Sequence, residues 1–338
     1  MGVESEDRLT SMVCRRAHWD LPWFAQWNAY FADASPAGGS FLPENVQFHR
    51  KAWEWAAIVQ ALYERGMMAP GMRGCGFAVG REPLACLFAG QGVEVLATDL
   101  GAAEGSAQAW STTGQHAASL DALYWPKLID RPAFDARVRF MPQDMRALEP
   151  DKLGTHDFIW SSCSFEHLGG LEAGLQFVLR STELLRPGGI AVHTTEFNLS
   201  SEDTTVATGD SVIYRRKDIS ALAHRLRLLG CGMERFDDFA GTAPEDLDYD
   251  YEPYYENGRQ HIKMMMGGFV TTSCLLIITK GRYPAVLPSI RAMALSPTAL
   301  AAPGTHAFAA GRFDSLRASA FWQLTAPLRA PLRRFLRR

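Results

Sequence analysis

The chain has 338 residues, of which 47% are hydrophobic and 21% charged, and its formal net charge is −3. This balance is typical of a globular protein with a large core, and the small negative charge gives no reason to expect a nucleic-acid partner. The six cysteines show no CxxC spacing, so we predict neither a structural zinc site nor any other bound metal.

The sequence also bears on cellular location. The N-terminal MGVESEDRLT is polar and acidic, unlike a signal peptide, and no stretch reaches the roughly 18 apolar residues of a membrane-spanning helix. Several cysteines lie in apolar runs, which suits buried and reduced thiols. We therefore expect a cytoplasmic protein.

Residues 1–66 are expected to form an N-terminal helical extension. Trp19, Trp23 and Trp27 recur every four residues, a spacing that places three indole rings on one face of a helix. These rings could pack in the core or form a wall of a binding pocket, and both interpretations stay open. A second helix is predicted over 44–66, where apolar residues recur with the helical period and a glycine ends the segment.

Strands and helices alternate over residues 67–281, and Asp218 is predicted to cap the last helix of the series. Strands are predicted at 93–100, 138–141, 157–162, 190–197 and 268–280, and helices at 84–90, 171–185 and 218–230. Such alternation predicts an α/β domain with a mostly parallel sheet that is covered by helices on both faces.

A glycine-rich segment, RGCGFAVGREP, stands where the first strand of this domain should turn into a helix. Its glycines, Gly74, Gly76 and Gly80, would let a nucleotide cofactor approach the backbone closely. Asp99 follows 19 residues after Gly80, at the predicted tip of the second strand. A carboxylate in that position is placed to hold two ribose hydroxyls.

Polar residues follow the next two strands as well. Asp144, in MPQDMRAL, could accept a hydrogen bond from an exocyclic amine of a base. Ser161 and Ser162 begin the run SSCSFEHLGG after the following strand, at the edge of a parallel sheet where ligands bind.

The order of these features resembles that of class I S-adenosylmethionine-dependent methyltransferases. The resemblance covers roughly residues 65–280, and LLRPGGIAVHTTE is its most specific part. It implies a Rossmann-like, seven-stranded, mostly parallel sheet and S-adenosylmethionine as the cofactor. By this resemblance Gly74, Gly76 and Gly80 would line the methionine moiety, Asp99 would hold the ribose, Asp144 would meet the adenine, and Ser161 to Ser164 would close the site.

The glycine loop departs from the pattern of that family in two respects. Arg73 stands where the family usually has an acid, and the spacing is GxGxxxG rather than GxGxG. These differences suggest that Glu82, at the start of the next helix, recognises the methionine amino group. A carboxylate there would equally suit the helix dipole. A dehydrogenase would prefer GxGxxG and two mononucleotide-binding halves, so we place methyl transfer ahead of hydride transfer.

Two residues are predicted to act in catalysis, His167 in SFEHLGG and Glu196 in HTTEFN. Methyl transfer is an in-line displacement that mainly requires alignment of the nucleophile, but a hydroxyl or amine acceptor benefits from a general base. His167 would titrate near neutrality, although it could also serve only to orient its loop.

A second polar cluster, DLDYDYEPYYENGRQHIKM, occupies residues 246–264. Tyrosine rings can pack on the CH faces of a sugar while carboxylates accept its hydroxyl groups. We predict that Asn198, Tyr251, Tyr254 and His261 bind the methyl acceptor. The alternatives for the cluster are a solvated loop and a protein contact.

The end of the chain has a different composition. Residues 282–311 are rich in Pro and Ala and are predicted to be a linker. In the basic tail, residues 312–338, five arginines beyond position 320 alternate with aromatic and aliphatic side chains, with no acid among them. That pattern suits binding to an anionic membrane surface. The alternatives are a solvated basic tail and a contact with a protein partner. FWQLTAPLR also resembles a C-terminal motif of bacterial enzymes of surface-polysaccharide assembly.

Together these features predict a methyltransferase that O-methylates a sugar hydroxyl in a surface glycan or a lipid-linked saccharide, in the cytoplasm or at the inner face of the membrane. Two alternatives stay open. One is methylation of a small-molecule metabolite, and the other is a non-catalytic scaffold that binds the cofactor within a glycan-assembly complex.

Overall fold

The computed structural model describes residues 8–34, 46–101 and 116–283. The predicted basic tail at 312–338 and almost all of the predicted linker at 282–311 lie outside the described residues. Within the described ranges, no helix is long and apolar enough to cross a membrane.

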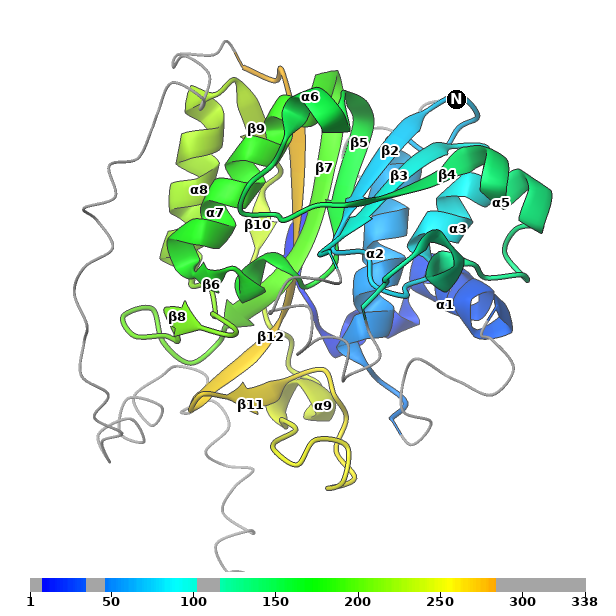
Figure 1. The fold of residues 1–338 in the computed structure, drawn as a ribbon. Coiled ribbons are helices and arrows are strands. Elements are labelled where there is room, and N and C mark those ends of the chain that lie inside the picture. Colours follow the sequence, from blue (N-terminus) through cyan, green and yellow to red (C-terminus); the bar gives the residue numbers. More distant parts are fainter. Residues whose placement is uncertain (1–7, 35–45, 102–115, 284–338) are drawn as a thin grey trace, which may run out of the picture.

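A ten-stranded sheet forms the centre of the molecule (Figure 1). Five adjacent strands run parallel, in the order β4 (Val138–Pro142), β3 (Glu94–Asp99), β2 (Arg73–Phe77), β5 (His156–Ser161) and β7 (Leu185–Asn198). The long strand β12 (Phe269–Lys280) then pairs with β7 in the antiparallel direction. Four short strands pair with or lie beyond β12, namely β1 (Ser11–Val13), β9 (Cys231–Met233), β10 (Phe236–Asp237) and β11 (Met264–Met266). A separate pair is formed by β6 (Gly169–Gly170) and β8 (Thr208–Gly209).

Helices cover both faces of the sheet. On one face lie α1 (Pro22–Ala34), α2 (Arg50–Glu64), α3 (Leu84–Gly90) and α5 (Arg131–Arg137), and on the other α7 (Leu171–Ser181) and α8 (Arg216–Leu228) (Figure 1). The described residues also form short helical segments, η1 (Arg16–Asp20), η2 (Leu120–Leu123), α6 (Pro150–Leu153), η3 (Phe165–His167), η4 (Thr182–Leu184) and α9 (Pro244–Leu247).

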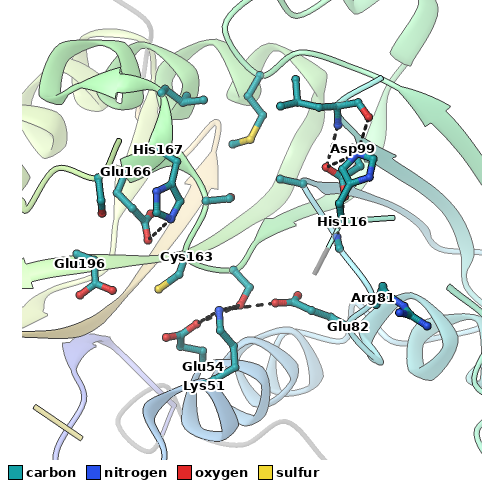
Figure 2. A pocket seen from close by; sticks show the side chains of 18 of the residues that line it. Lys51, Glu54, Arg81, Glu82, Asp99, His116, Cys163, Glu166, His167 and Glu196 are labelled. Atoms are coloured by element: carbon teal, nitrogen blue, oxygen red, sulfur yellow. Dashed lines mark hydrogen bonds and ion pairs between the residues drawn. The ribbon is translucent and has the colours of Figure 1, made fainter. Parts of the chain in front are cut away.

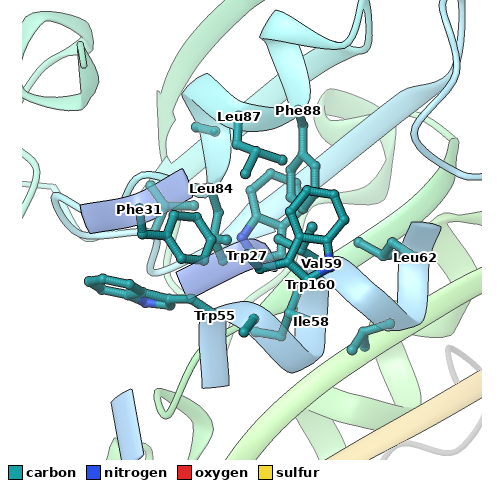
Figure 3. Close-up of a cluster of buried hydrophobic side chains, with 14 of the residues drawn as sticks. Trp27, Phe31, Trp55, Ile58, Val59, Leu62, Leu84, Leu87, Phe88 and Trp160 are labelled. Carbon is teal, nitrogen blue, oxygen red and sulfur yellow. The ribbon is translucent and has the colours of Figure 1, made fainter. Parts of the chain in front are cut away.

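Strand alternation divides the core into two layers. Phe158 and Trp160 of β5 pack toward α2 and α3, whereas Ile159 between them packs toward α7 and α8. Figure 3 shows the first layer, in which Trp160 lies among side chains of α1, α2 and α3. Both faces of the central strands are therefore apolar, as expected for a buried parallel sheet.

The predicted fold class, a mostly parallel α/β sheet with helices on both faces, is confirmed. The sheet has ten strands rather than seven, because short strands gather along β12. One of them, β1, comes from the segment predicted as a helical extension, and it pairs with β12 through Met12 and Val13.

Two local predictions at the helices need correction. The helix predicted from residue 44 begins at Arg50, where the His49 side chain caps it by accepting a hydrogen bond from the Lys51 amide. Asp218 is not the cap of α8 but its third residue, and its carboxylate accepts a hydrogen bond from the Arg215 amide. The tryptophans at 19, 23 and 27 pack against the core and none lines the pocket described below.

Candidate functional site

A pocket of about 490 Å³ lies at the carboxyl ends of the parallel strands. Much of its lining lies at or just after the ends of β2, β3, β4 and β5, within 78–82, 99–100, 143–146 and 162–168, and Glu196 lies near the end of β7. Further lining comes from the start of α2, from the segment between α9 and β11 and from β11 itself, through His49, Arg50, Lys51, Glu54, Tyr255, His261, Met264 and Met266. In Figure 2, Lys51 and Glu54 project from α2 at the lower side of the pocket. This edge of a parallel sheet is where ligands of open α/β folds bind.

The turn after β2 places main-chain atoms at the pocket. Ala78 and Gly80 both have positive φ angles, +46° and +53°, so the chain reverses sharply before α3. The Gly80 amide donates a hydrogen bond of 3.1 Å to Asp99 Oδ2. This bond fixes the turn to the end of β3.

Gly74 and Gly76, predicted to line the cofactor, do not line the pocket. They lie inside β2, where a Cβ at Gly74 would come within 2.4 Å of the Phe158 ring and one at Gly76 within 2.4 Å of the Trp160 ring. Their lack of a side chain therefore makes room for aromatic packing. Arg73 begins the same strand and is absent from the lining, so its departure from the family pattern does not bear on this pocket.

Asp99, predicted to hold the ribose, lines the pocket and is almost fully buried. Its Oδ2 accepts hydrogen bonds from the Gly80 and Ala117 amides at 3.1 and 3.2 Å, and its Oδ1 accepts one from the Leu100 amide at 2.8 Å. Burial raises the pKa of Asp99, against the opposing effect of these amide donors. The carboxylate is thus held in one orientation at the end of β3.

Asp144 also lines the pocket, but its carboxylate is occupied. Arg146 Nε lies 3.0 Å from both of its oxygens, and the Arg146 amide donates to Oδ1 at 2.8 Å. Burial alone would raise the pKa of Asp144; the hydrogen bonds from Arg146 outweigh it and lower the pKa.

The two predicted serines at the end of β5 point in different directions. Ser161 is fully buried and its Oγ lies 2.8 Å from His193 Nδ1, away from the pocket. Ser162 does line the pocket; its Oγ donates to Glu54 Oε2 at 3.2 Å and accepts from Lys51 Nζ at 3.3 Å. The difference follows from strand alternation, since successive side chains point to opposite faces.

A group of buried and half-buried charged side chains, which we call the α2 charge cluster, was not predicted as a group. It comprises Arg50, Lys51, Glu54, Glu82 and Glu196. Lys51 Nζ lies 2.7 Å from Glu54 Oε2 and 3.7 Å from Glu82 Oε1, and Arg50 pairs with Glu196. Burial raises the pKa of Glu82 to about 7, whereas Lys51 and Arg50 overcome burial and lower that of Glu54 to about 2.

The signal for this cluster was present in the sequence. Lys51 and Glu54 are three residues apart and Arg50 and Glu54 four apart, the spacings at which side chains meet on a helix. Glu54 moreover interrupts the apolar run WEWAA, where a carboxylate needs a partner.

The predicted catalytic residues both line the pocket, and each of them is engaged by neighbouring groups. His167 Nδ1 donates to the Asp210 carbonyl at 2.7 Å, and its Nε2 lies 3.9 Å from Glu166 Oε1. Burial lowers the pKa of His167 to about 4, so the ring does not titrate near neutrality. Glu196 is paired with Arg50 and accepts from Thr271 Oγ1 at 3.0 Å.

Glu166, which was not among the predicted site residues, is fully buried in the lining beside His167. Its Oε2 accepts a hydrogen bond from Thr195 Oγ1 at 3.0 Å. Burial and the nearby negative charge of Glu196 raise the pKa of Glu166 to about 8. This carboxyl group is therefore mostly protonated at neutral pH.

Of the predicted acceptor residues, only His261 lines the pocket. Tyr251 is 42% exposed, and the Tyr254 hydroxyl donates to the Met265 carbonyl at 2.7 Å. The Asn198 side chain organises its own loop, accepting from the amides of residues 200 and 201 and donating to residues 204 and 205. The pocket tyrosine is Tyr255 instead.

Within the described residues, Cys163, Glu166 and Glu196 bring one potential ligand atom each within 4.8 Å of one another. Burial holds the pKa of the Cys163 thiol well above its usual value, and Arg50 already neutralises Glu196. A metal would need the thiolate and a free carboxylate, so we assign no metal to this group.

No family model matches the chain, and no curated protein matches it. Among solved structures, it is similar to magnesium protoporphyrin IX methyltransferase from Synechocystis PCC 6803 with bound SAH (13% identity, 78% of this chain and 97% of that chain, TM-score 0.43). It is also similar to a putative sarcosine dimethylglycine methyltransferase from Galdieria sulphuraria (14%, 69% and 84%, TM-score 0.41) and to the CcbJ methyltransferase from Streptomyces caelestis (14%, 71% and 99%, TM-score 0.40). Similarity at this level carries no argument about function, which is inferred from the residues of this chain.

Proposed function

We propose that this chain is an S-adenosylmethionine-dependent methyltransferase. The observation that carries the proposal is the meeting of the Gly80 turn and the Asp99 carboxylate in one pocket at the carboxyl ends of the parallel strands. A sharp backbone turn after one strand and an acid after the next suit a nucleoside with free ribose hydroxyls. The cavity volume lies in the range of small-molecule and cofactor sites.

The residues of the pocket fit this cofactor, which supplies a methyl group activated on a sulfonium. Asp99 would hold the ribose, and residues 143–146 would flank the adenine. Glu82 and Lys51 offer opposite charges for the ammonium and carboxylate of the methionine end.

Isothermal titration calorimetry tests cofactor binding. We expect heat of binding with S-adenosylmethionine and with S-adenosylhomocysteine, and at least a tenfold loss of affinity in Asp99→Ala. Asp121→Ala, an exposed aspartate outside the pocket, is the matched control and should bind as the wild type does. Absence of heat with the intact protein would refute the proposal.

For the acceptor, we propose a hydroxyl group of a sugar, in a surface glycan or a lipid-linked saccharide. Of the residues predicted for the acceptor, His261 lines the pocket, and the other kinds recur there, with Tyr255 as the ring and Glu166 and Glu196 as carboxyl groups. Aromatic faces and carboxylates are the groups that bind sugars. The glycan-assembly setting and attachment to a membrane rest on the sequence of residues 312–338.

The acceptor is tested by incubating the protein with methyl-labelled cofactor and two sets of acceptors, simple methyl glycosides and lipid-linked glycans. Formation of an O-methyl sugar together with S-adenosylhomocysteine supports the proposal. Labelling of phenols or protein lysines alone would place the acceptor in another class. Cofactor binding without turnover on any acceptor would favour the non-catalytic scaffold.

A further inference from the structure

A chain of hydrogen bonds runs along one wall of the pocket, from the cap of α2 into the segment between α9 and β11. His49 Nε2 lies 3.4 Å from the Tyr255 hydroxyl, which lies 3.5 Å from His261 Nε2. His261 Nδ1 in turn lies 2.7 Å from Asp250 Oδ2. The three rings line the pocket and Asp250 is fully buried behind them.

The partners of each ring fix where its proton lies. His49 Nδ1 accepts a hydrogen bond from the Lys51 amide at 3.0 Å, so the neutral His49 ring carries its proton on Nε2. The Asp250 carboxylate can only accept, so His261 carries its proton on Nδ1 and presents the lone pair of Nε2. Burial lowers the pKa of His49 well below its usual value and that of His261 to about 4, which keeps both rings neutral.

Several hydrogen bonds hold the Asp250 side chain in place. Its carboxylate also accepts from the amides of Tyr251 and Tyr255, at 2.9 and 3.2 Å, and from Asn257 Nδ2 at 2.7 Å. Four donors therefore anchor one buried carboxylate, and the carboxylate orients the His261 ring.

Resting on the proposed function, we propose that the Asp250–His261 pair is the general base of the methyl transfer, and that it takes the proton of the acceptor hydroxyl on His261 Nε2. The acceptor oxygen forms a bond to the methyl carbon while the carbon–sulfur bond breaks and its electron pair stays on sulfur. The hydroxyl proton moves to His261 Nε2, directly or through Tyr255. The positive charge passes from the sulfonium to the imidazolium, so the net charge of the pocket is unchanged.

Several charged groups face His261. Arg50 lowers its pKa, whereas Asp250 and Glu54 raise it. The Asp250 carboxylate lies in direct contact and stabilises the imidazolium once it forms, as a buried aspartate does behind a catalytic histidine. At 3.5 Å the Tyr255 hydroxyl is at the limit of a hydrogen bond, so Nε2 keeps the capacity to accept from a closer donor.

His167 offers a weaker alternative. Its Nδ1 is backed by the neutral carbonyl of Asp210 and not by a carboxylate, so an imidazolium there would have less stabilisation. The neighbour of His167 Nε2 is Glu166, whose raised pKa leaves its carboxyl group mostly protonated at neutral pH. A neutral carboxyl group stabilises an imidazolium less than a carboxylate does.

The test compares steady-state rates of S-adenosylhomocysteine formation with methyl α-glucoside, α-mannoside and α-galactoside as acceptors. We expect His261→Gln to lower kcat by about 100-fold or more, the usual contribution of a general base, with cofactor affinity unchanged. Asp250→Asn should lower kcat as well. Tyr255→Phe keeps the aromatic ring but removes the hydroxyl, and so tests whether the proton passes through Tyr255. His156→Gln, a buried histidine outside the pocket, controls for loss of packing and should keep its kcat.

Imidazole nitrogen NMR of the full chain gives a readout that needs no acceptor. We expect His261 to be neutral with its proton on Nδ1 at pH 7, and Asp250→Asn to move that proton to Nε2. A proton on Nε2 in the wild type, or a kcat in His261→Gln within threefold of wild type, would overturn the inference. If the wild type binds cofactor yet turns over none of the glycosides, the proposed acceptor class fails, and the NMR result still decides whether the pair is built as a base.

Discussion

Replacing Gly76 by alanine separates a packing role from a cofactor role for the glycines of β2. The new Cβ would lie 2.4 Å from Trp160 Cζ2 and 2.5 Å from Val79 Cγ1, whereas carbon atoms pack best at about 3.5–4.0 Å. Trp160 is fully buried, and its ring centroid lies 4.9 Å from that of Phe88 and 5.8 Å from that of Phe158. The indole therefore has little room to move away.

The expected cost follows from this geometry. Overpacking of a filled core costs typically about 1–3 kcal/mol, and in a domain of this size each kcal/mol lowers Tm by about 2–4 °C. Gly76→Ala should therefore lower Tm by roughly 2–12 °C. The cofactor affinity of the folded fraction should stay within about twofold, because Gly76 does not line the pocket.

Thermal unfolding and calorimetry with S-adenosylhomocysteine give the two readouts. Gly80→Ala is the companion variant, since Gly80 lines the pocket and has a φ of +53°. It should lose affinity by a larger factor than Gly76→Ala does. An unchanged Tm together with lost binding in Gly76→Ala would refute the packing role and restore that glycine to the cofactor site.

Two further predictions concern the buried charges. Lys51→Met should weaken the binding of S-adenosylmethionine, measured by calorimetry, but not the binding of methylthioadenosine, which lacks the amino-acid end. An equal loss of affinity for both ligands would contradict a role of Lys51 in binding the amino-acid end. The folded state keeps the Glu166 proton up to about pH 8, whereas an unfolded glutamate releases it near its ordinary pKa of 4.5. The folded state thus binds more protons within this window, and the free energy of unfolding should fall as pH rises through it. Denaturant unfolding at pH 5, 6.5 and 8 should show a smaller fall in Glu166→Gln than in the wild type, and equal slopes would contradict the raised pKa.

The order of strands and helices was predictable because each central element carries its own hydrophobic period. The run at 157–162 became β5 and the run at 268–280 became β12, with ends shifted by at most a residue. The short strands β1, β9 and β10 were not predicted, since two or three residues carry no measurable period. β12 is long enough to pair with β1 and β9 as well as with β7, and β10 pairs in turn with β1.

The candidate site was predicted in part. Asp99 and Gly80 were identified because an acid and a turn at strand ends depend only on strand order. Ser161 was misplaced because a shift of one residue at a strand end changes the face of the sheet. Tyr255 was missed in favour of Tyr254 because the segment between α9 and β11 has no regular period from which side-chain direction could be predicted.

We propose that S-adenosylmethionine binds at the carboxyl ends of the parallel strands, against Asp99. The most direct measurement is a crystal structure of the protein grown with S-adenosylhomocysteine. We expect density for the ribose within hydrogen-bonding distance of the Asp99 carboxylate, with the amino-acid end toward Glu82 and Lys51. Density elsewhere on the molecule, or a ligand at this edge that does not contact Asp99, would contradict it.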